Sequence, residues 1–173
     1  MKKDIFILLV IVCITTHIVR ATYEILKHKK MIKATKLSFL IVFTNMVLLW
    51  ISWFGLCIFD AKRIYLTEMI HFLGIIMALI GVVAFFSGLF TIKSLESYNG
   101  DLITHGIYSK IRHPMYLGFI LWIIGMPLYS GGLMSMILGT IFILNILFWR
   151  HLEEKELENR FPAYKEYRMK TLF

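Results

Sequence analysis

Charged residues are scarce in this sequence and absent from four long stretches. Only 17% of the 173 residues are charged, against about 25% in an average soluble domain, and 58% are apolar. Lysine, arginine, aspartate and glutamate are all missing from residues 5–19, 37–59, 69–92 and 114–149. With a mean hydropathy of +0.73, this distribution excludes an ordinary soluble domain and indicates a membrane protein.

Cysteine is also scarce, and several familiar motifs are missing. Cys13 and Cys57 each stand alone in an apolar stretch, which favours packing over a disulfide or a metal pair. The sequence contains no GxGxxG after a strand-like run, no GxSxG and no GxxxxGK[ST], which excludes the soluble folds that carry them. No residues have the spacing of a zinc site, and His105 and His113 lack the further histidines of a di-iron site. We therefore expect no metal.

The uncharged stretches predict five membrane-spanning segments in one all-α domain. A span needs about 20 apolar residues, so residues 37–59 and 69–92 qualify by length alone. Residues 5–19 form a shorter segment whose flanking cations can reach outward, and Arg20 can pair with Glu24 one turn later. Residues 114–149 supply the last two segments.

The last uncharged stretch is too long for one span and predicts a short helical hairpin. It contains the sequence PLYSGG at residues 127–132, where we expect the break. The first arm, residues 115–128, would measure only about 21 Å against a hydrocarbon core of about 30 Å. The region around His113 should therefore lie recessed in a cavity, because polar backbone at membrane depth needs protein or water around it.

Basic residues gather on one side of the predicted membrane. With five spans, 15 of the 19 Lys and Arg residues fall in the 20–36 loop, the 93–112 loop and the tail after Trp149. The positive-inside rule then places these loops and the C-terminus in the cytoplasm and the N-terminus outside. The net charge of +8 thus indicates a membrane surface, and we expect no nucleic-acid partner.

The first three segments, residues 1–92, are interpreted as a scaffold for a catalytic region at residues 93–173. Small residues fall near one stripe of the third segment, and the favoured explanation is close helix packing rather than a gap for a ligand. They are Gly74, Ala78, Gly81 and Gly88.

Two polar groups flank the hairpin and should meet at its cytoplasmic mouth. They are Tyr108, Arg112, His113 and Tyr116 before it, and Glu153 and Glu154 after it. Aromatic faces attract a cation such as a sulfonium, carboxylates bind ammonium or ribose hydroxyls, and arginine holds a carboxylate. The set suits a zwitterionic ligand with an aromatic base. Composition alone would instead favour a tail that is an amphipathic helix on the membrane, with its charges solvated.

Two motifs resemble those of the integral-membrane methyltransferases typified by isoprenylcysteine carboxyl methyltransferase. LITHGIYSKIRHPMYLG is similar to that family's LVTSGPYxxxRHPxYxG, and EEKELENRFPAYKEY is similar to its EExxLxxxFGxxYxxY. The resemblance covers about residues 100–167, and phospholipid N-methyltransferases share much of the pattern. It implies S-adenosylmethionine as the methyl donor, bound between the cytoplasmic ends of the last two spans. The cofactor contacts that it implies are Leu102, Ile103, Tyr108, His113, Pro114, Met115, Tyr116 and Glu153.

The sequence departs from the family pattern at one important position. Trp149 replaces an arginine that the resemblance implies for the substrate carboxylate, and Arg150, one residue on, is the candidate substitute. With Arg112 and Glu154, it completes the predicted catalytic set, in which Glu154 or His113 would deprotonate an amine acceptor.

The predicted function is methyl transfer from S-adenosylmethionine to a membrane-embedded lipid or lipidated acceptor, most like isoprenylcysteine carboxyl O-methylation. A phospholipid N-methyltransferase and a sterol-reductase-like oxidoreductase are the alternatives, and a non-catalytic membrane scaffold is the third. The sequence does not predict the oligomeric state.

Overall fold

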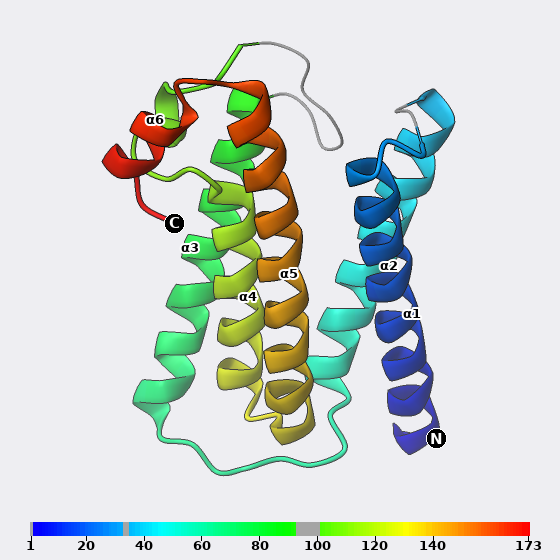
Figure 1. The fold of residues 1–173 in the computed structure, drawn as a ribbon. Helices are drawn as coiled ribbons and strands as arrows, with labels where there is room; N and C mark the ends of the chain where they lie inside the picture. Colours follow the sequence, from blue (N-terminus) through cyan, green and yellow to red (C-terminus); the bar gives the residue numbers. More distant parts are fainter. Residues whose placement is uncertain (1, 33–34, 93–100) are drawn as a thin grey trace.

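The computed structural model describes residues 2–32, 35–92 and 101–173, and it is built from helices (Figure 1). Within these residues it has α1 (Lys2–His28), α2 (Lys36–Ile58), α3 (Glu68–Ile92), the 3-10 helix η1 (Gly106–Ser109), α4 (Pro114–Ser130), α5 (Leu133–Arg160) and α6 (Tyr164–Lys170). The extended pairings among them are two isolated bridges, so the prediction of an all-α protein is confirmed. The predicted boundary at Lys93 lies outside the described residues.

Four helices, α1, α2, α3 and α5, are long and apolar enough to cross a membrane. The chain is therefore a multi-pass membrane protein. The remaining apolar helix, α4, has 17 residues, or about 26 Å at 1.5 Å per residue, and is the shortest of the five. The helix α1 continues past the uncharged stretch, which ends at Val19, to His28, and Arg20 and Glu24 form the expected ion pair one turn apart on it.

Glycines bring the backbones of α3 and α4 into contact. A Cβ atom on Gly81 would lie 2.6 Å from the carbonyl oxygen of Gly118, and one on Gly118 would lie 2.5 Å from the carbonyl oxygen of Gly81. Gly74 and Gly125 meet in the same way nearer the hairpin turn. Small residues permit this approach between membrane helices, so the predicted role of the α3 stripe in close packing is confirmed.

The hairpin of α4 and α5 is present with its turn inside the predicted residues 127–132, but α4 ends two residues later than predicted. The helix α4 passes through Pro127 and ends at Ser130 instead of Leu128. Gly131 has a φ of +68°, and its N–H and that of Gly132 both donate to the carbonyl oxygen of Pro127. This left-handed glycine cap ends the helix, whereas Pro127 lies inside it and only leaves the carbonyl four residues earlier without its helical N–H donor.

The loop between α2 and α3 is fastened to the hairpin turn. The buried carboxylate of Asp60 accepts hydrogen bonds from the backbone N–H and the hydroxyl of Ser135, both at 2.7 Å. The N–H of Leu133 donates to the carbonyl oxygen of Lys62 at 2.9 Å. Asp60 thus satisfies backbone donors at the start of α5 and ties the bundle together at this end.

The tail predicted after Trp149 is shared between two helices. Because α5 has 28 residues, or about 42 Å, its last turns extend beyond a hydrocarbon core of about 30 Å. The helical path breaks at Phe161 and Pro162 and resumes in α6. The chain then returns to the segment before α4, where Arg112 N–H donates to the Leu172 carbonyl oxygen at 3.0 Å.

Aromatic side chains and the two cysteines fill the interior. Trp53, Phe85, Trp122 and Phe142 belong to one buried cluster that connects α2, α3, α4 and α5. Cys13 and Cys57 are free and fully buried in the same cluster, which confirms their predicted role in packing. The helix α1 packs against α2 and α5, and Figure 1 shows it beside α2.

Candidate functional site

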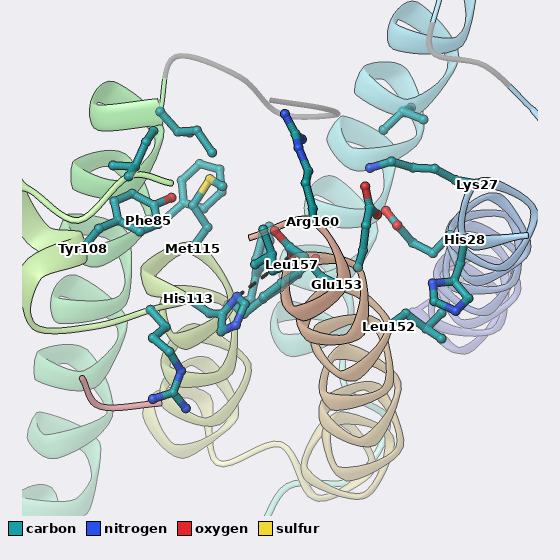
Figure 2. Close-up of a pocket in the computed structure, with 18 of the residues that line it drawn as sticks. Lys27, His28, Phe85, Tyr108, His113, Met115, Leu152, Glu153, Leu157 and Arg160 are labelled. Carbon is teal, nitrogen blue, oxygen red and sulfur yellow. Dashed lines mark ion pairs between the residues drawn. The ribbon is translucent and has the colours of Figure 1, made fainter. Parts of the chain in front are cut away.

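A cavity of about 190 Å³ lies where α4 begins. It is bounded by α1, α2, α5 and the segment from residue 101 to the start of α4. Figure 2 shows Tyr108, His113 and Met115 on one side of α5 and Lys27 and His28 of α1 on the other. Figure 1 shows that α4 begins short of the ends of α3 and α5. The prediction of a recessed cavity around His113 is therefore confirmed.

His113 joins the two predicted motifs. It caps α4 and is only 4% exposed, so its ring is held between neighbours. Its Nε2 atom lies 3.3 Å from Oε1 of Glu154 and 3.4 Å from the hydroxyl oxygen of Tyr164, and its Nδ1 atom lies 4.0 Å from Oε2 of Glu153. The imidazole therefore bridges two adjacent carboxylates, one of which faces the cavity.

Glu154 lies behind His113 and is the buried centre of a cluster of charged side chains. Its Oε1 atom lies 3.5 Å from Nε of both Arg112 and Arg150, and its Oε2 atom lies 4.0 Å from Nη2 of Arg168. The carboxylate is buried and is not among the residues that line the cavity. This position makes Glu154 a counter-ion for several cations, whose attraction keeps a carboxylate charged.

The two arginines of the predicted catalytic set are also held by the protein. Nη1 of Arg112 donates to the carbonyl oxygens of Thr171 at 2.6 Å and Arg168 at 2.9 Å. Arg150 lies over the ring of Phe173, 4.4 Å from its centre, and does not line the cavity. Arg112 lines the cavity with part of its side chain. The structure thus brings Arg112, Arg150 and Glu154 together, but places only Arg112 on the cavity wall.

Tyrosines from η1 and α6 form another part of the wall. Tyr167 donates its hydroxyl hydrogen to the carbonyl oxygen of Tyr108 at 2.6 Å, which fastens α6 to η1. Burial, strengthened by the nearby Glu153 carboxylate, raises the pKa of Tyr108. Burial likewise raises the pKa of Tyr164, with Glu154 adding to the effect. These phenols therefore remain protonated donors at neutral pH.

Seven of the eight predicted cofactor contacts line the cavity. They are Leu102, Ile103, Tyr108, His113, Met115, Tyr116 and Glu153. Pro114 is the exception, because it is fully buried against α3, where a Cβ atom on Gly88 would lie 2.9 Å from its Cγ atom. Pro114 therefore positions the start of α4 and does not contact the cavity. The binding roles of the other seven remain predictions.

The sequence interpretation missed the contribution of α1 and α2. Arg20, Glu24, Lys27 and His28 of α1 line the cavity, although residues 1–92 were expected to act as scaffold. The spacing of Arg20 and Glu24 predicted their ion pair but not the direction in which it points. Arg20 also lies over the ring of Trp149, 5.8 Å from its centre, which is the position where the family arginine is replaced.

The wall formed by α2 is apolar. One face of the helix turns toward the cavity over three turns, and its lining residues are Phe39, Val42, Phe43, Met46, Val47 and Trp50. The same cavity is lined by carboxylates and cations from α1 and α5. It therefore offers an apolar side beside a polar one.

Comparison with known families agrees with this geometry. The model of the phospholipid methyltransferase family matches residues 69–163, more than half of the chain. The chain belongs to this family. The resemblance that the two motifs predicted is thereby confirmed, and the matched region includes α3, α4, α5 and the cavity residues between them. No solved structure matches this phospholipid methyltransferase family member significantly.

Curated relatives of this family member are named protein-S-isoprenylcysteine O-methyltransferases. The Schizosaccharomyces pombe protein is 35% identical over 72 residues, which cover 40% of this chain and 30% of the relative. The Arabidopsis thaliana protein, form A, is 29% identical over 129 residues, which cover 63% of this chain and 59% of the relative. The Saccharomyces cerevisiae protein is 37% identical over 83 residues, which cover 46% of this chain and 34% of the relative. The chain thus matches less than two thirds of the length of each relative.

Proposed function

We propose that this protein transfers a methyl group from S-adenosylmethionine to a lipid-like acceptor within the membrane. The observation that supports it is the position of Glu153 and His113. They come from the two family motifs, and they meet beside a cavity whose other wall is apolar. A polar site for the methyl donor next to an apolar surface suits a reaction between a soluble cofactor and a methyl acceptor embedded in the membrane.

The residues that line the cavity fit S-adenosylmethionine. Glu153 has 42% of its side chain exposed, so its carboxylate can accept hydrogen bonds from an ammonium group or ribose hydroxyls. Tyr108 and Tyr116 offer aromatic faces, which attract a sulfonium cation, and the adjacent Met115 is apolar. Leu102 and Ile103 supply further apolar wall for the adenine ring. When bound, S-adenosylmethionine supplies a methyl group that is already activated by the positive sulfur.

The protein's own contribution is mainly positioning. His113, held between Glu153 and Glu154, fixes the start of α4 against α5. Glu154 neutralises Arg112 and Arg150 behind the wall, so we assign these three residues to supporting the site rather than to contacting the acceptor. Holding donor and acceptor in line accounts for most of the acceleration when the donor is already charged.

An oxygen nucleophile fits this wall better than an amine. A carboxylate acceptor needs no base, whereas an amine must first lose a proton. Of the two candidate bases, Glu154 is enclosed by arginines and His113 and lies off the cavity, and His113, which lines the cavity, is held between two carboxylates. Isoprenylcysteine-type carboxyl O-methylation, the activity for which the curated relatives are named, is therefore our first choice. Phospholipid N-methylation is the alternative that the family model's name supports.

Binding of S-adenosylhomocysteine and NADPH to the detergent-purified protein, measured by isothermal titration calorimetry, tests the proposal. We expect S-adenosylhomocysteine to bind and NADPH not to bind. Binding of NADPH alone would indicate a reductase, and binding of neither compound would indicate a scaffold. Either result would overturn the proposal.

A further inference from the structure

The guanidinium of Arg20 is an unusual group in the cavity wall. The residue is 8% exposed, and its Nη2 atom pairs with Oε1 of Glu24. Its Nε and Nη1 atoms are buried, and neither has a hydrogen-bond partner among the residues that the structure describes. A buried donor without a partner destabilises the folded protein, and the cost is larger when the group is charged. Such a group therefore points to a ligand that supplies acceptor oxygens.

The surroundings of Arg20 hold it in one orientation. Glu24 fixes Nη2 from the same helix, and the rings of Tyr23 and Trp149 each lie 5.8 Å from the Cζ atom. The Nε–H lies on the edge that it shares with Nη2, and Nη1 carries its N–H groups on the other side of the planar group, so the two unpartnered atoms offer separate donors to an anion. A planar group held in this way loses little conformational entropy when it binds an anion.

One indole group beside Arg20, that of Trp149, offers a further donor. The Nε1 atoms of Trp50 and Trp149 are also buried without a hydrogen-bond partner among the described residues. Trp50 lines the main cavity together with Arg20. It also lines a small neighbouring cavity of about 10 Å³, whose wall includes Trp149. The unpartnered donors of Arg20 and Trp149 therefore lie side by side where α1 meets α5.

We propose that Arg20 binds the acidic group of the acceptor lipid through an N–H group that has no partner in the described part of the chain. This assignment rests on the proposed function and deepens it, because it makes the acceptor an anionic amphiphile whose apolar part lies along α2. A carboxylate and a phosphate have the same chemistry toward a guanidinium. The position of Arg20 also gives α1 a direct role in acceptor recognition, apart from the cofactor contacts on α4 and α5.

Matched pairs of acidic and uncharged lipids test the assignment. N-acetyl-S-farnesylcysteine is compared with its methyl ester, and dioleoyl phosphatidate is compared with dioleoylglycerol. Each is titrated into the detergent-solubilised full-length protein, and S-adenosylhomocysteine is titrated into the same samples. We expect the acid of at least one pair to bind about tenfold or more tightly than its uncharged partner. The pair that shows the preference identifies carboxylate or phosphate as the group recognised.

Arg20→Gln should abolish this preference while leaving the affinity for the uncharged lipid and for S-adenosylhomocysteine unchanged. Lys155→Gln, which removes an exposed positive charge that does not line the cavity, should preserve it. If Arg20→Gln fails to fold, Arg20→Gln with Glu24→Gln removes both charges of the pair and leaves no unpaired buried carboxylate. The same loss of preference is expected there.

The absence of a preference for the acid in both pairs, or its persistence without Arg20, would overturn the assignment. The proposed function is judged separately by the binding of S-adenosylhomocysteine to the wild-type protein. A protein that binds this compound but does not distinguish acid from uncharged lipid is a methyltransferase without the Arg20 site. A protein that distinguishes the lipids but does not bind S-adenosylhomocysteine has the Arg20 site without the proposed activity.

Discussion

The Nε2 atom of His113 lies 3.3 Å from Oε1 of Glu154, and this contact joins the start of α4 to the end of α5 behind the cavity. Asp60 and Ser135 make the corresponding connection at the opposite end of the bundle. The hairpin is therefore fastened at both ends by side chains that lie far apart in the sequence. The following predictions separate the residues that hold the site from those expected to contact a ligand.

Glu154→Gln should destabilise the protein, because it leaves Arg112, whose side chain is only 9% exposed, without its counter-ion. Removing one partner from a buried ion pair costs about 3–5 kcal/mol, so the thermal unfolding midpoint in detergent should fall clearly. Glu166→Gln, which breaks an exposed pair with Lys170, should leave the midpoint unchanged. Equal midpoints for the two variants would mean that the Glu154 cluster contributes nothing to stability.

Glu153→Gln should weaken S-adenosylhomocysteine binding about tenfold or more and reduce methyl transfer to match, because its carboxylate faces the cavity. Glu158→Gln provides the control, since Glu158 lies in the same helix and pairs with Arg168 at 2.6 Å, away from the cavity lining. Calorimetry on both variants makes the comparison. Equal and mild effects would show that the end of α5 is only an anchor on the membrane.

His113→Ala and Tyr116→Phe should each lower the affinity for S-adenosylmethionine about tenfold or more. A hydrogen bond to a charged group contributes roughly 1.5–3 kcal/mol, and both side chains lie in the cavity wall. Tyr129→Phe removes a hydroxyl from the other end of α4 and should have no effect on binding. Unchanged affinity in both cavity variants would remove these residues from the site.

Gly118→Ala should destabilise the bundle by about 1–3 kcal/mol, because the new methyl group would meet backbone atoms of α3 and force the helices apart. Gly55→Ala is the matched control. Its Cβ atom would meet the Cδ1 atom of Leu9 at 2.8 Å, and the end of a flexible side chain can move. Thermal unfolding of the two variants in detergent should therefore differ, and similar midpoints would contradict the backbone contact.

The basic end of the bundle should face the cytoplasm. The end of α1, the start of α2 and the tail after Trp149 lie at the same end in Figure 1, and 15 of the 19 Lys and Arg residues belong to the three segments predicted there. A reporter that is active only in the cytoplasm and is fused after Phe173 should give a signal. A well-expressed fusion that gives no signal would indicate that the C-terminus lies on the opposite side of the membrane.

Much of the fold could be predicted because membrane spans depend on local composition. The uncharged stretches located α2 and α3 to within a residue at each end, and the two glycines in PLYSGG indicated the hairpin turn. The limits of α4 were less predictable. Pro127 suggested an early end, but Gly131 adopts the left-handed conformation that a helix C-terminus requires, and this decides where the helix stops.

The candidate site was predictable only in part, because some of its residues belong to recognisable motifs and others do not. Motifs on either side of the hairpin identified His113 and Glu153, since hairpin topology brings both ends of the stretch together. Arg20 carries no motif, and its pairing with Glu24 is equally compatible with a side chain that reaches toward lipid headgroups. Only the packing of α1 against α5 places Arg20 over Trp149 and in the cavity wall.

The contact between Gly81 and Gly118 has a consequence for how sequences of this fold can diverge. Each glycine fills the space of the other's missing Cβ atom with a backbone carbonyl oxygen, not with a side chain. A side chain gained at one position therefore cannot be offset by a smaller residue at the other, because both are already glycine. In relatives that share this packing, the two positions should be invariant without covarying, whereas side-chain contacts elsewhere in the bundle can exchange volume between partners.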